Sequence, residues 1–412
     1  MLHIDPAPTL DPYVCLTHRR ARTTPRTWRV LHLLPDLAIG GGVTIVLHHV
    51  RHADRQRFTI MVASLGGDDT ARPRFVECGV EPLEFDLSGD GLAITVARVV
   101  HAIHREGIDL LHVHSDTDRR VGELAAFLTR TPIVSHLHAE WVHLGPHLPE
   151  GAGPLRRVKG HVAGWARDRL EHTTTARYVA DSAAIMPRFA PLVRRPITPI
   201  RQAVPLEEID AARARGCDTA LRDELDIPPA APVLLTVARM VDGKGHDDLV
   251  TVLRRVVRRH PEVVHVLVGD GPRRRAIEAA MDDARLTEHV RVLGNRADVP
   301  ALLTLGTIFV FPSVTESFGI AVLEAMAAGM PVVAYRLPAF ETFTVAGTTA
   351  VLVPVGEADA LAEGVEALLS DPARAGALGQ AGRRVVEERC TGSSVARDFE
   401  TVYEQVLEHE TR

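Results

Sequence analysis

The clearest indication of the fold is the sequence IFVFPSVTESFGIAVLEAMAAGMPVVA, residues 308–334. Its apolar start predicts a buried strand that ends at Pro312. An apolar helix is expected to begin around 318–319, and the next strand covers 331–335. Two short buried strands joined by a helix are typical of a parallel sheet in an α/β protein.

The same alternation extends along the whole chain. Short apolar runs that predict strands form two series, with a proline-rich crossing between them at 187–205. The first series covers 28–35, 57–65, 109–114 and 132–138, and the second covers 233–238, 263–269, 290–294, 308–312 and 331–335. We therefore predict the fold class as α/β, with two Rossmann-like domains whose parallel sheets face each other across a cleft.

The length of 412 residues agrees with two or three domains. Residues 1–27 are rich in proline and arginine without periodicity, which predicts a flexible N-terminal extension. Residues 28–190 are assigned to the first Rossmann-like domain and residues 191–390 to the second. Residues 391–412 are expected to form a C-terminal helix that packs back towards the first domain.

Composition excludes several classes of protein. With 46% apolar residues the chain is not disordered, and a net charge of −6 with 4% aromatic residues argues against nucleic acid as a partner. Four widely spaced cysteines, no signal peptide and no apolar run long enough to span a membrane favour a cytoplasmic protein. Only Lys159 and Lys244 are lysine among 47 basic residues, so each lysine deserves inspection.

Two glutamates within residues 308–334 are candidate functional residues. Glu316 stands just before the predicted helix, and Glu324 lies two turns into it, among apolar residues that disfavour a merely solvated carboxylate. Backbone N–H groups at the positive end of such a helix can bind a diphosphate, and Gly319 lets an anion approach the backbone closely. Helix capping by Glu316 is the alternative interpretation.

The pattern E-S-F-G-x-x-x-x-E-A-M-A-x-G-x-P-V-V-A closely resembles the signature of the retaining glycosyltransferases with two Rossmann domains (GT-B), family 4. The resemblance implies that Glu316 is a catalytic residue that holds hydroxyls of the donor sugar, and that Glu324 holds the ribose of the nucleotide. It also implies that the second domain binds the nucleotide sugar and the first lies on the acceptor side. The backbone that would bind the diphosphate belongs to Ser317, Phe318, Gly319 and Ile320.

Three further segments match this family in order. TVARMVDGKGHDDLV (236–250) resembles its G-R-x-x-x-x-K-G segment, which implies that Arg239 and Lys244 clamp the diphosphate, although Ala238 replaces the usual glycine. VLVGDGPRRR (266–275) resembles its V-G-x-G-P turn, which places Gly271 on the donor side. The segment 290–303 resembles the part that receives the nucleobase, around Asn295 and Arg296, although ordinary connecting loops look similar.

In the first domain, Gly40-Gly41-Gly42 follows the first predicted strand directly. Such a loop can bring backbone N–H groups close to phosphate or sugar, so Gly41 and Gly42 are candidate donor-binding residues, with a plain turn as the alternative. The family carries a histidine at the end of the strand predicted over 132–138, and His138 matches it best as a catalytic residue, with His136 as the fallback. His114 matches a position near the acceptor, although simple packing explains it nearly as well.

The paired histidines raise the question of a metal. His112 with His114, and His136 with His138, have the i, i+2 spacing that points to one face of a strand. Four converging histidines would suggest a metal site, but 16 of the 21 histidines lie in residues 1–190, so chance pairs are common. The resembling enzymes generally need no catalytic metal, so we predict neither a metal site nor a cofactor.

One basic segment remains. Residues 151–177 hold six basic and two acidic residues, with Val158, Val162 and Trp165 spaced like one helical face. A peripheral membrane contact on the cytoplasmic side is one interpretation, and a solvated helix packed on its own domain is the other. The oligomeric state cannot be read from the sequence.

Together these features predict transfer of a hexose-type sugar from a UDP- or GDP-sugar to an acceptor hydroxyl with retention, in glycan, glycolipid or natural-product biosynthesis. A front-face route fits best, because no carboxylate pair is placed for double displacement. The alternatives are a sugar-nucleotide epimerase of the same architecture, against which the E-x7-E segment argues, and a non-catalytic nucleotide-sugar-binding relative. A nicotinamide dehydrogenase would need a GxGxxG fingerprint that the sequence lacks.

Overall fold

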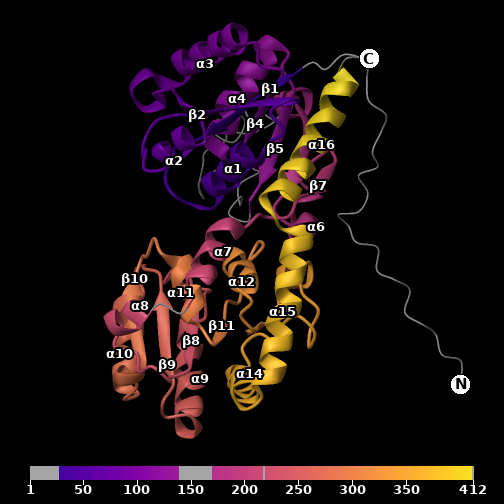
Figure 1. The fold of residues 1–412 in the computed structure, drawn as a ribbon. Coiled ribbons are helices and arrows are strands. Elements are labelled where there is room, and N and C mark those ends of the chain that lie inside the picture. The colour runs from indigo at the N-terminus through magenta and orange to yellow at the C-terminus, as the bar shows by residue number, and fades with distance from the viewer. Residues whose placement is uncertain (1–26, 139–168, 217–218, 411–412) are drawn as a thin grey trace, which may run out of the picture. The chain divides into compact units, whose positions relative to one another are not determined.

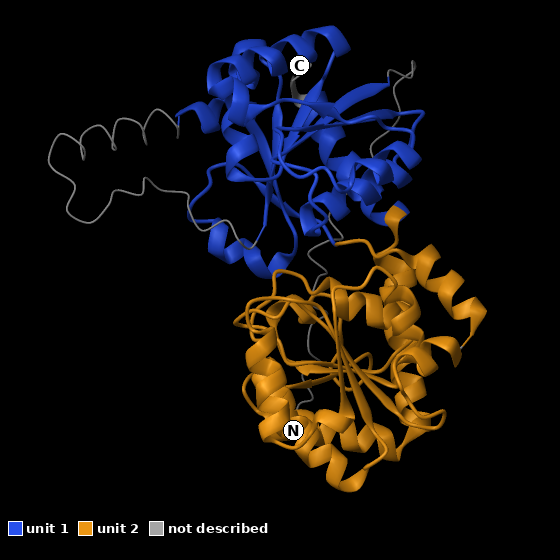
Figure 2. Cartoon of the chain, turned by 90° about the vertical axis from the view of Figure 1, so that its left-hand side faces the viewer, with its two compact units in different colours: residues 1–201, 393–412 blue, residues 202–392 orange. Residues whose placement is uncertain are grey.

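The computed structural model describes residues 27–138, 169–216 and 219–410. The chain divides into two compact units, one formed by residues up to 201 together with those from 393 onwards, the other by residues 202–392 (Figures 1 and 2). The expected extension over 1–27 lies outside the described residues except for Thr27, as does 151–168 of the basic segment. Among the described helices, none is both long enough and apolar enough to cross a bilayer.

The first unit is built on a seven-stranded parallel sheet with the order β3-β2-β1-β4-β5-β6-β7. Its strands are β1 (Trp28–Leu34), β2 (Phe58–Ser64), β3 (Leu83–Glu84), β4 (Leu110–Val113), β5 (Ile133–Leu137), β6 (Thr175–Ala180) and β7 (Ile197–Pro199). Its main helices are α1 (Gly41–His52), α2 (Arg72–Glu77), α3 (Leu87–Glu106), α4 (Asp116–Thr129), α6 (Met186–Phe189) and α16 (Gly392–Glu410).

The two faces of this sheet differ because successive side chains of a strand point to opposite sides. One face is apolar, and residues such as Leu31, Leu111 and Ile133 pack there against α3 and α4. The other face carries histidines and is covered by α1 and by α16, whose Phe399 and Tyr403 contact the histidine rings. The histidines that alternate with the apolar residues are His32, His112, His114 and His136.

The second unit contains a six-stranded parallel sheet with the order β10-β9-β8-β11-β12-β13. Its strands are β8 (Val233–Val237), β9 (Val264–Val268), β10 (Val290–Gly294), β11 (Ile308–Phe311), β12 (Val332–Tyr335) and β13 (Val351–Val353). Its helices are α7 (Leu206–Arg215), α8 (Thr219–Glu224), α9 (His246–Arg259), α10 (Arg274–Asp283), α11 (Val299–Leu305), α12 (Ile320–Ala327), α13 (Pro338–Glu341), α14 (Ala358–Ser370) and α15 (Pro372–Arg389). Valine and leucine side chains of the strands pack against α9, α10 and α14 in one continuous core.

The structure moves one boundary. Residues 191–201, which we assigned to the second domain, belong to the first unit because β7 pairs with β6. The strands β3, β6, β7 and β13 were not predicted, since three of them have only two or three residues and β6 contains Arg177 and a polar start. Within the basic segment, residues 169–174 are helical and β6 begins at Thr175, so a single helix over 151–177 is wrong at its end.

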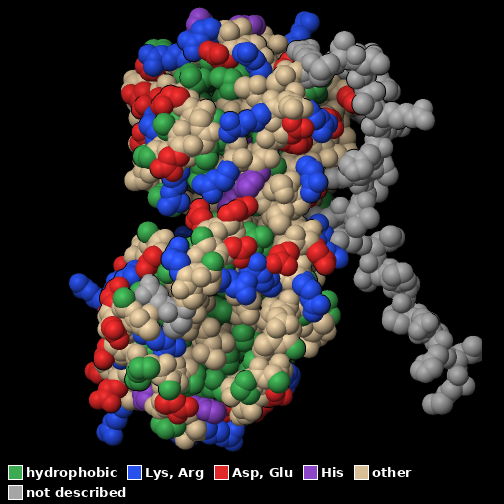
Figure 3. Space-filling model, viewed as in Figure 1, with side chains coloured by type: hydrophobic (Ala, Val, Ile, Leu, Met, Phe, Trp, Pro, Cys, Tyr) green, Lys and Arg blue, Asp and Glu red, His purple; other side chains and the backbone are tan. Residues whose placement is uncertain are grey.

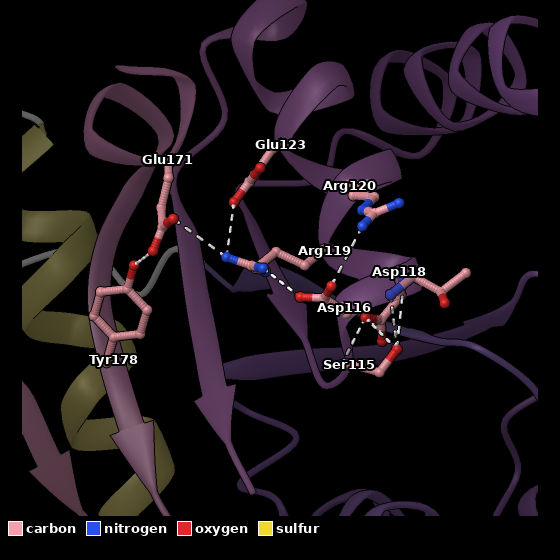
Figure 4. A network of polar contacts seen from close by, with 9 residues as sticks. Ser115, Asp116, Asp118, Arg119, Arg120, Glu123, Glu171 and Tyr178 are labelled. Carbon is pink, nitrogen blue, oxygen red and sulfur yellow. Dashed lines mark hydrogen bonds and ion pairs between the residues drawn. The ribbon is translucent and has the colours of Figure 1, made fainter. Parts of the chain in front are cut away.

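A buried polar network fixes α4 to the chain that leads into β6 (Figure 4). The side chain of Arg119 is fully buried, and it contacts carboxylates of Asp116, Glu123 and Glu171. The hydroxyl of Tyr178 in turn donates to Glu171. A guanidinium buried in this way must be compensated by paired carboxylates, because an unpaired buried charge costs several kcal/mol. The network therefore joins α4 to Glu171, just before β6, and to Tyr178 within β6.

Candidate active site

In the second unit, Lys244 and Glu316 form a close ion pair at the carboxyl edge of the sheet. Lys244 Nζ lies 2.6 Å from Glu316 Oε1, and the two side chains are 18% and 12% exposed. Lys244 follows β8 and Glu316 follows β11, and these strands are neighbours in the sheet. The two loops are also joined by the backbone, since Val314 N donates to Gly243 O at 2.9 Å. The sequence predicted both residues, and the fold brings them together.

Gly319 marks the turn into α12. It has φ 97°, and a Cβ there would lie 2.3 Å from Phe340 Cε1, so both the backbone angle and the space require glycine. The helix begins at Ile320, one or two residues later than predicted. Neighbouring Phe318 is buried and packs against Phe343 with ring centroids 5.1 Å apart and the ring planes tilted by 43°, which anchors the loop. The N–H groups of Ser317–Ile320 therefore lie at the start of this helix, where the helix dipole is positive.

Glu324 lies in α12 as the sequence predicted. Burial, and to a smaller extent the charge of Glu208, raise the pKa of this carboxyl to about 7. The carboxyl is thus poised between its two protonation states near neutral pH. Such a shift in a polar residue of an apolar helix is typical of functional sites.

The loops after β8 and β9 are in direct backbone contact. Met240 N donates to Asp270 O at 2.8 Å, and a Cβ on Gly271 would lie 2.4 Å from Met240 O. Arg239 is exposed in the first of these loops, one residue before Met240. The structure therefore places the turn at Gly271 beside the segment that carries Arg239.

In the segment predicted to receive the nucleobase, the arginine already forms ion pairs within the protein. The guanidinium of Arg296 is engaged by two carboxylates, Asp298 at 2.7 Å and Glu224 at 2.7 Å, which raise its pKa. Asn295 beside it is exposed. In this structure Arg296 joins α8 to the loop after β10, and its predicted role in donor binding stays a prediction.

In the first unit, the glycine loop lies beside the predicted histidine. A Cβ on Gly42 would come 3.9 Å from His138 Nε2, so the start of α1 and the end of β5 meet. A Cβ on Gly41 would meet nothing within 4 Å. His138 is 19% exposed on its side chain, whereas His136 is fully buried.

Asp181 holds both histidines and was not predicted. His136 Nε2 lies 3.0 Å from one of its oxygens, and His138 Nδ1 lies 3.1 and 3.0 Å from the two. Burial alone would raise the pKa of Asp181, but the adjacent His138 and His136 hold it below its usual range. The residue follows β6, so recognising that strand in TARYVA would have placed a carboxylate at the same sheet edge as His138.

Deeper in the sheet the histidines bond to one another. His32 Nδ1 lies 2.9 Å from His114 Nε2, and His32 Nε2 lies 3.0 Å from His49 Nδ1. His112 Nδ1 lies 2.7 Å from the hydroxyl of Tyr403. Burial lowers the pKa of His49 to about 3, and burial together with His138 lowers that of His136 to about 4. These imidazoles are therefore neutral at pH 7, and His114 belongs to this buried group.

The sequence matches family models over most of its length. Residues 218–385 match the model described as "Glycosyl transferases group 1", and residues 39–208 match "Glycosyltransferase Family 4". The chain is 31% identical over 265 residues to the GDP-mannose-dependent alpha-(1-6)-phosphatidylinositol monomannoside mannosyltransferase of Mycolicibacterium smegmatis, covering 58% of this chain and 67% of that protein. It is 26% identical over 313 residues to the alpha-D-kanosaminyltransferase of Streptomyces kanamyceticus, covering 71% and 78%.

A solved structure supports the fold. Anabaena HepE in complex with UDP-glucose superposes with a TM-score of 0.73 at 21% identity, covering 91% of this chain and 99% of that one. The two Rossmann-like units and this similarity show that the chain has the GT-B fold. The chain belongs to the glycosyltransferases of group 1 and family 4, and it is a glycosyltransferase that uses nucleotide sugars.

Proposed function

We propose that this glycosyltransferase moves a hexose-type sugar from UDP- or GDP-sugar to an acceptor hydroxyl in the cytoplasm, with retention at the anomeric carbon. The observation that carries the proposal is the Lys244–Glu316 pair in the loops after β8 and β11, with Glu324 about one turn into the helix α12 that follows. The Lys244 ammonium can bind a phosphate oxygen, and the Glu316 carboxylate beside it can accept a hydrogen bond from a sugar hydroxyl. The comparisons do not favour the epimerase alternative.

On the donor, Lys244 and Arg239 would bind the diphosphate oxygens, together with the N–H groups of Ser317–Ile320. Positive groups fixed where phosphate charge develops lower the barrier to departure of the leaving group. Because these cations and dipoles are already present, the proposal requires no obligatory metal. The ion pair with Glu316 holds Lys244 in place before a donor arrives.

The sugar and the ribose would be held by carboxylates. Glu316 would accept hydrogen bonds from hydroxyls of the transferred sugar, and Glu324 would accept them from the ribose. In the first unit, His138 would act on the transferred sugar, with Asp181 fixing its ring so that Nδ1 is engaged. The leaving phosphate would then help to deprotonate the acceptor hydroxyl on the front face.

The similar proteins indicate candidate donors and acceptors by analogy. The Mycolicibacterium relative is named as GDP-mannose-dependent and the HepE structure contains UDP-glucose, so both nucleotides belong in the test. By their names, the Mycolicibacterium relative is a phosphatidylinositol monomannoside mannosyltransferase and the Streptomyces relative is a kanosaminyltransferase. We therefore propose a glycan, glycolipid or natural-product hydroxyl as the acceptor, with the nucleobase contacts assigned to Asn295 and Arg296.

The test is a thermal-shift panel of UDP- and GDP-sugars on the purified protein, because a true donor stabilises only the folded state. The donor that raises the midpoint is then incubated with candidate acceptors, and the product is examined by NMR. An α-configured donor should give an α-linked product. A β-linked product would contradict retention, and stabilisation by no nucleotide sugar would contradict the donor site.

A further inference from the structure

Three histidines gather at the carboxyl edge of the first unit's sheet. One candidate ligand nitrogen from each of His114, His136 and His138 lies within 4.8 Å of the other two. The rings of His136 and His138 have centroids 4.3 Å apart, and that of His114 lies 5.4 Å from His136 and 6.0 Å from His138. Neutral imidazole is the most common metal ligand among side chains.

Strand register produces this cluster. Val113 at the end of β4 pairs with Ser135 in β5, so the next residues, His114 and His136, point to the same face of the sheet. His138 follows His136 by two residues and returns to that face. Three imidazoles thus meet where the strands end.

An anionic carboxylate supports two of the three rings. Asp181 accepts from His136 Nε2 and His138 Nδ1, at 3.0 Å each. This leaves the opposite nitrogen of each ring directed away from the carboxylate. Within the described part of the chain, His136 Nδ1 is buried and has no hydrogen-bond partner. Metal-binding histidines almost always donate their other ring N–H to a carboxylate, a backbone carbonyl or a water, which fixes the orientation of the ring, and a carboxylate also supplies negative charge.

A second triad, formed by His32, His112 and His114, is less suitable. Both nitrogens of His32 already contact other imidazoles, those of His114 and His49. All three residues are at most 3% exposed, and within the described residues no carboxylate contacts His32 or His112. A doubly charged ion buried there would lack compensating charge, which is costly.

We propose that His114, His136 and His138 form a binding site for a divalent transition metal ion of the Zn²⁺ type, with Asp181 as the supporting carboxylate. Three imidazole ligands with one side open is the arrangement that leaves a coordination position for an exchangeable group. The partial exposure of His138 gives the ion access. A bound ion occupies His138, so we expect it to inhibit transfer. That consequence rests on the proposed function, whereas metal binding does not.

The test uses the full-length, tag-free protein after treatment with a chelator. Titration with Zn²⁺ in a calorimeter should show saturable binding of one ion per chain, and Co²⁺ should give the visible absorption of a low-coordinate nitrogen site. His136→Gln should abolish the one-to-one binding, and Asp181→Asn should weaken it by about 10- to 100-fold. His32→Gln should leave it within about threefold, and His104→Ala, an exposed residue of α3, should leave it unchanged.

Circular dichroism and the melting midpoint, both measured with chelator present, show whether each variant is folded. Where His136→Gln does not fold, the spectrum and stoichiometry of the unmodified protein decide the matter. Unaltered Zn²⁺ affinity in a folded His136→Gln variant would overturn the proposal. So would loss of binding in a folded His32→Gln variant, or only weak binding of several ions per chain without a low-coordinate Co²⁺ spectrum.

Discussion

The two units share one architecture but place their polar groups differently. In the second unit the strands are mostly aliphatic, and the polar candidates Lys244, Glu316 and Arg239 stand in loops after the strands. In the first unit, histidines lie inside the sheet itself and bond to one another beneath α16. The surface adds little to this contrast, since basic and acidic side chains are interspersed over the visible face (Figure 3).

The difference shows that a parallel sheet can position functional side chains in two ways, either in the loops after its strands or on the strands themselves. Loop residues such as Lys244 are partly exposed at the carboxyl edge of the sheet, so they suit the binding of a diphosphate. Sheet residues such as His112 are neutral because burial lowers their pKa, so they can serve only as hydrogen-bonding or ligand groups.

Acid should unfold the first unit before the second. In the folded first unit His32, His49, His112, His114 and His136 have pKa values lowered by burial, so protons bind preferentially to the unfolded chain. Stability is fully present above about pH 6.5 and falls as the pH drops towards the folded pKa values, by about 1.4 kcal/mol per pH unit for each group. In the second unit, His246 and His265 behave in this way.

Hydrogen exchange followed by mass spectrometry between pH 7.5 and 5, with chelator present, measures this order. After correction for the intrinsic exchange rates, peptides from β4 should lose protection at a higher pH than peptides from β9. The acid midpoint should not move in His101→Ala, an exposed histidine on α3. Earlier loss of protection in β9 would show that the histidine face does not limit acid stability.

Lys244→Ala should reduce kcat/KM by about 100- to 1000-fold and weaken nucleotide binding, because a fixed charge on the diphosphate is lost. It also leaves the Glu316 carboxylate without the ammonium it contacts at 2.6 Å. Arg258→Ala removes an exposed cation of α9 and is the matched control, with no change expected. Steady-state kinetics and calorimetry measure both effects, and wild-type nucleotide affinity in Lys244→Ala would remove this residue from the donor site.

His138→Ala should lower kcat by about 10- to 100-fold, the size expected for loss of a hydrogen bond to the reacting sugar. Nucleotide affinity should stay at its wild-type value, in contrast to Lys244→Ala. The comparison is made by turnover and calorimetry on both variants, with His101→Ala as the control. A weakened affinity for the nucleotide alone, with kcat unchanged, would argue that His138 has no role in transfer.

Donor affinity should depend on the ionisation of Glu324, whose pKa burial raises to about 7. Ribose hydroxyls donate to the carboxylate, so binding favours the ionised form, and affinity should fall below pH 7 by up to about tenfold per pH unit. Calorimetry with the active nucleotide sugar between pH 6 and 8 measures this slope. Glu324→Gln should flatten it, and Glu363→Gln, an exposed residue of α14, should not. An equal slope in Glu324→Gln would assign the titration to another group.

The smallest effect separates two buried tyrosines. Tyr403→Phe leaves His112 Nδ1 without the hydroxyl at 2.7 Å, at a cost of about 1–3 kcal/mol in unfolding free energy. Tyr335→Phe removes a bond of 2.6 Å to Asp248, a half-buried carboxylate that water can reach, so it should cost less than about 1 kcal/mol. Denaturant unfolding at pH 7.5 compares them. An equal loss of unfolding free energy in the two variants would mean that water also reaches the histidine face of the first unit's sheet.

The sequence predicted the regular parts of both sheets because their strands are continuous apolar runs, such as IFVF at 308–311. It predicted Glu316 because this residue falls in a long motif, and Lys244 because it falls in a second segment, 236–250, that matches the same family. It did not predict Asp181, since β6 mixes polar and apolar residues and its tyrosine and the preceding Glu171 contact a network around Arg119 that is distant in sequence. Nor did it predict that His32 and His49 join the histidines of β4, because that contact depends on strand order and on how α1 packs.

The first unit is discontinuous in sequence, since α16 covers its histidine face. During synthesis, the strands from β1 to β7 leave the ribosome long before Phe399 and Tyr403 exist. The second unit lies wholly within 202–392, so all of its sheet is available earlier. We therefore expect the domain that begins first to be completed last, and a nascent chain stalled before residue 393 to carry a folded second unit beside a first unit that still awaits its final helix.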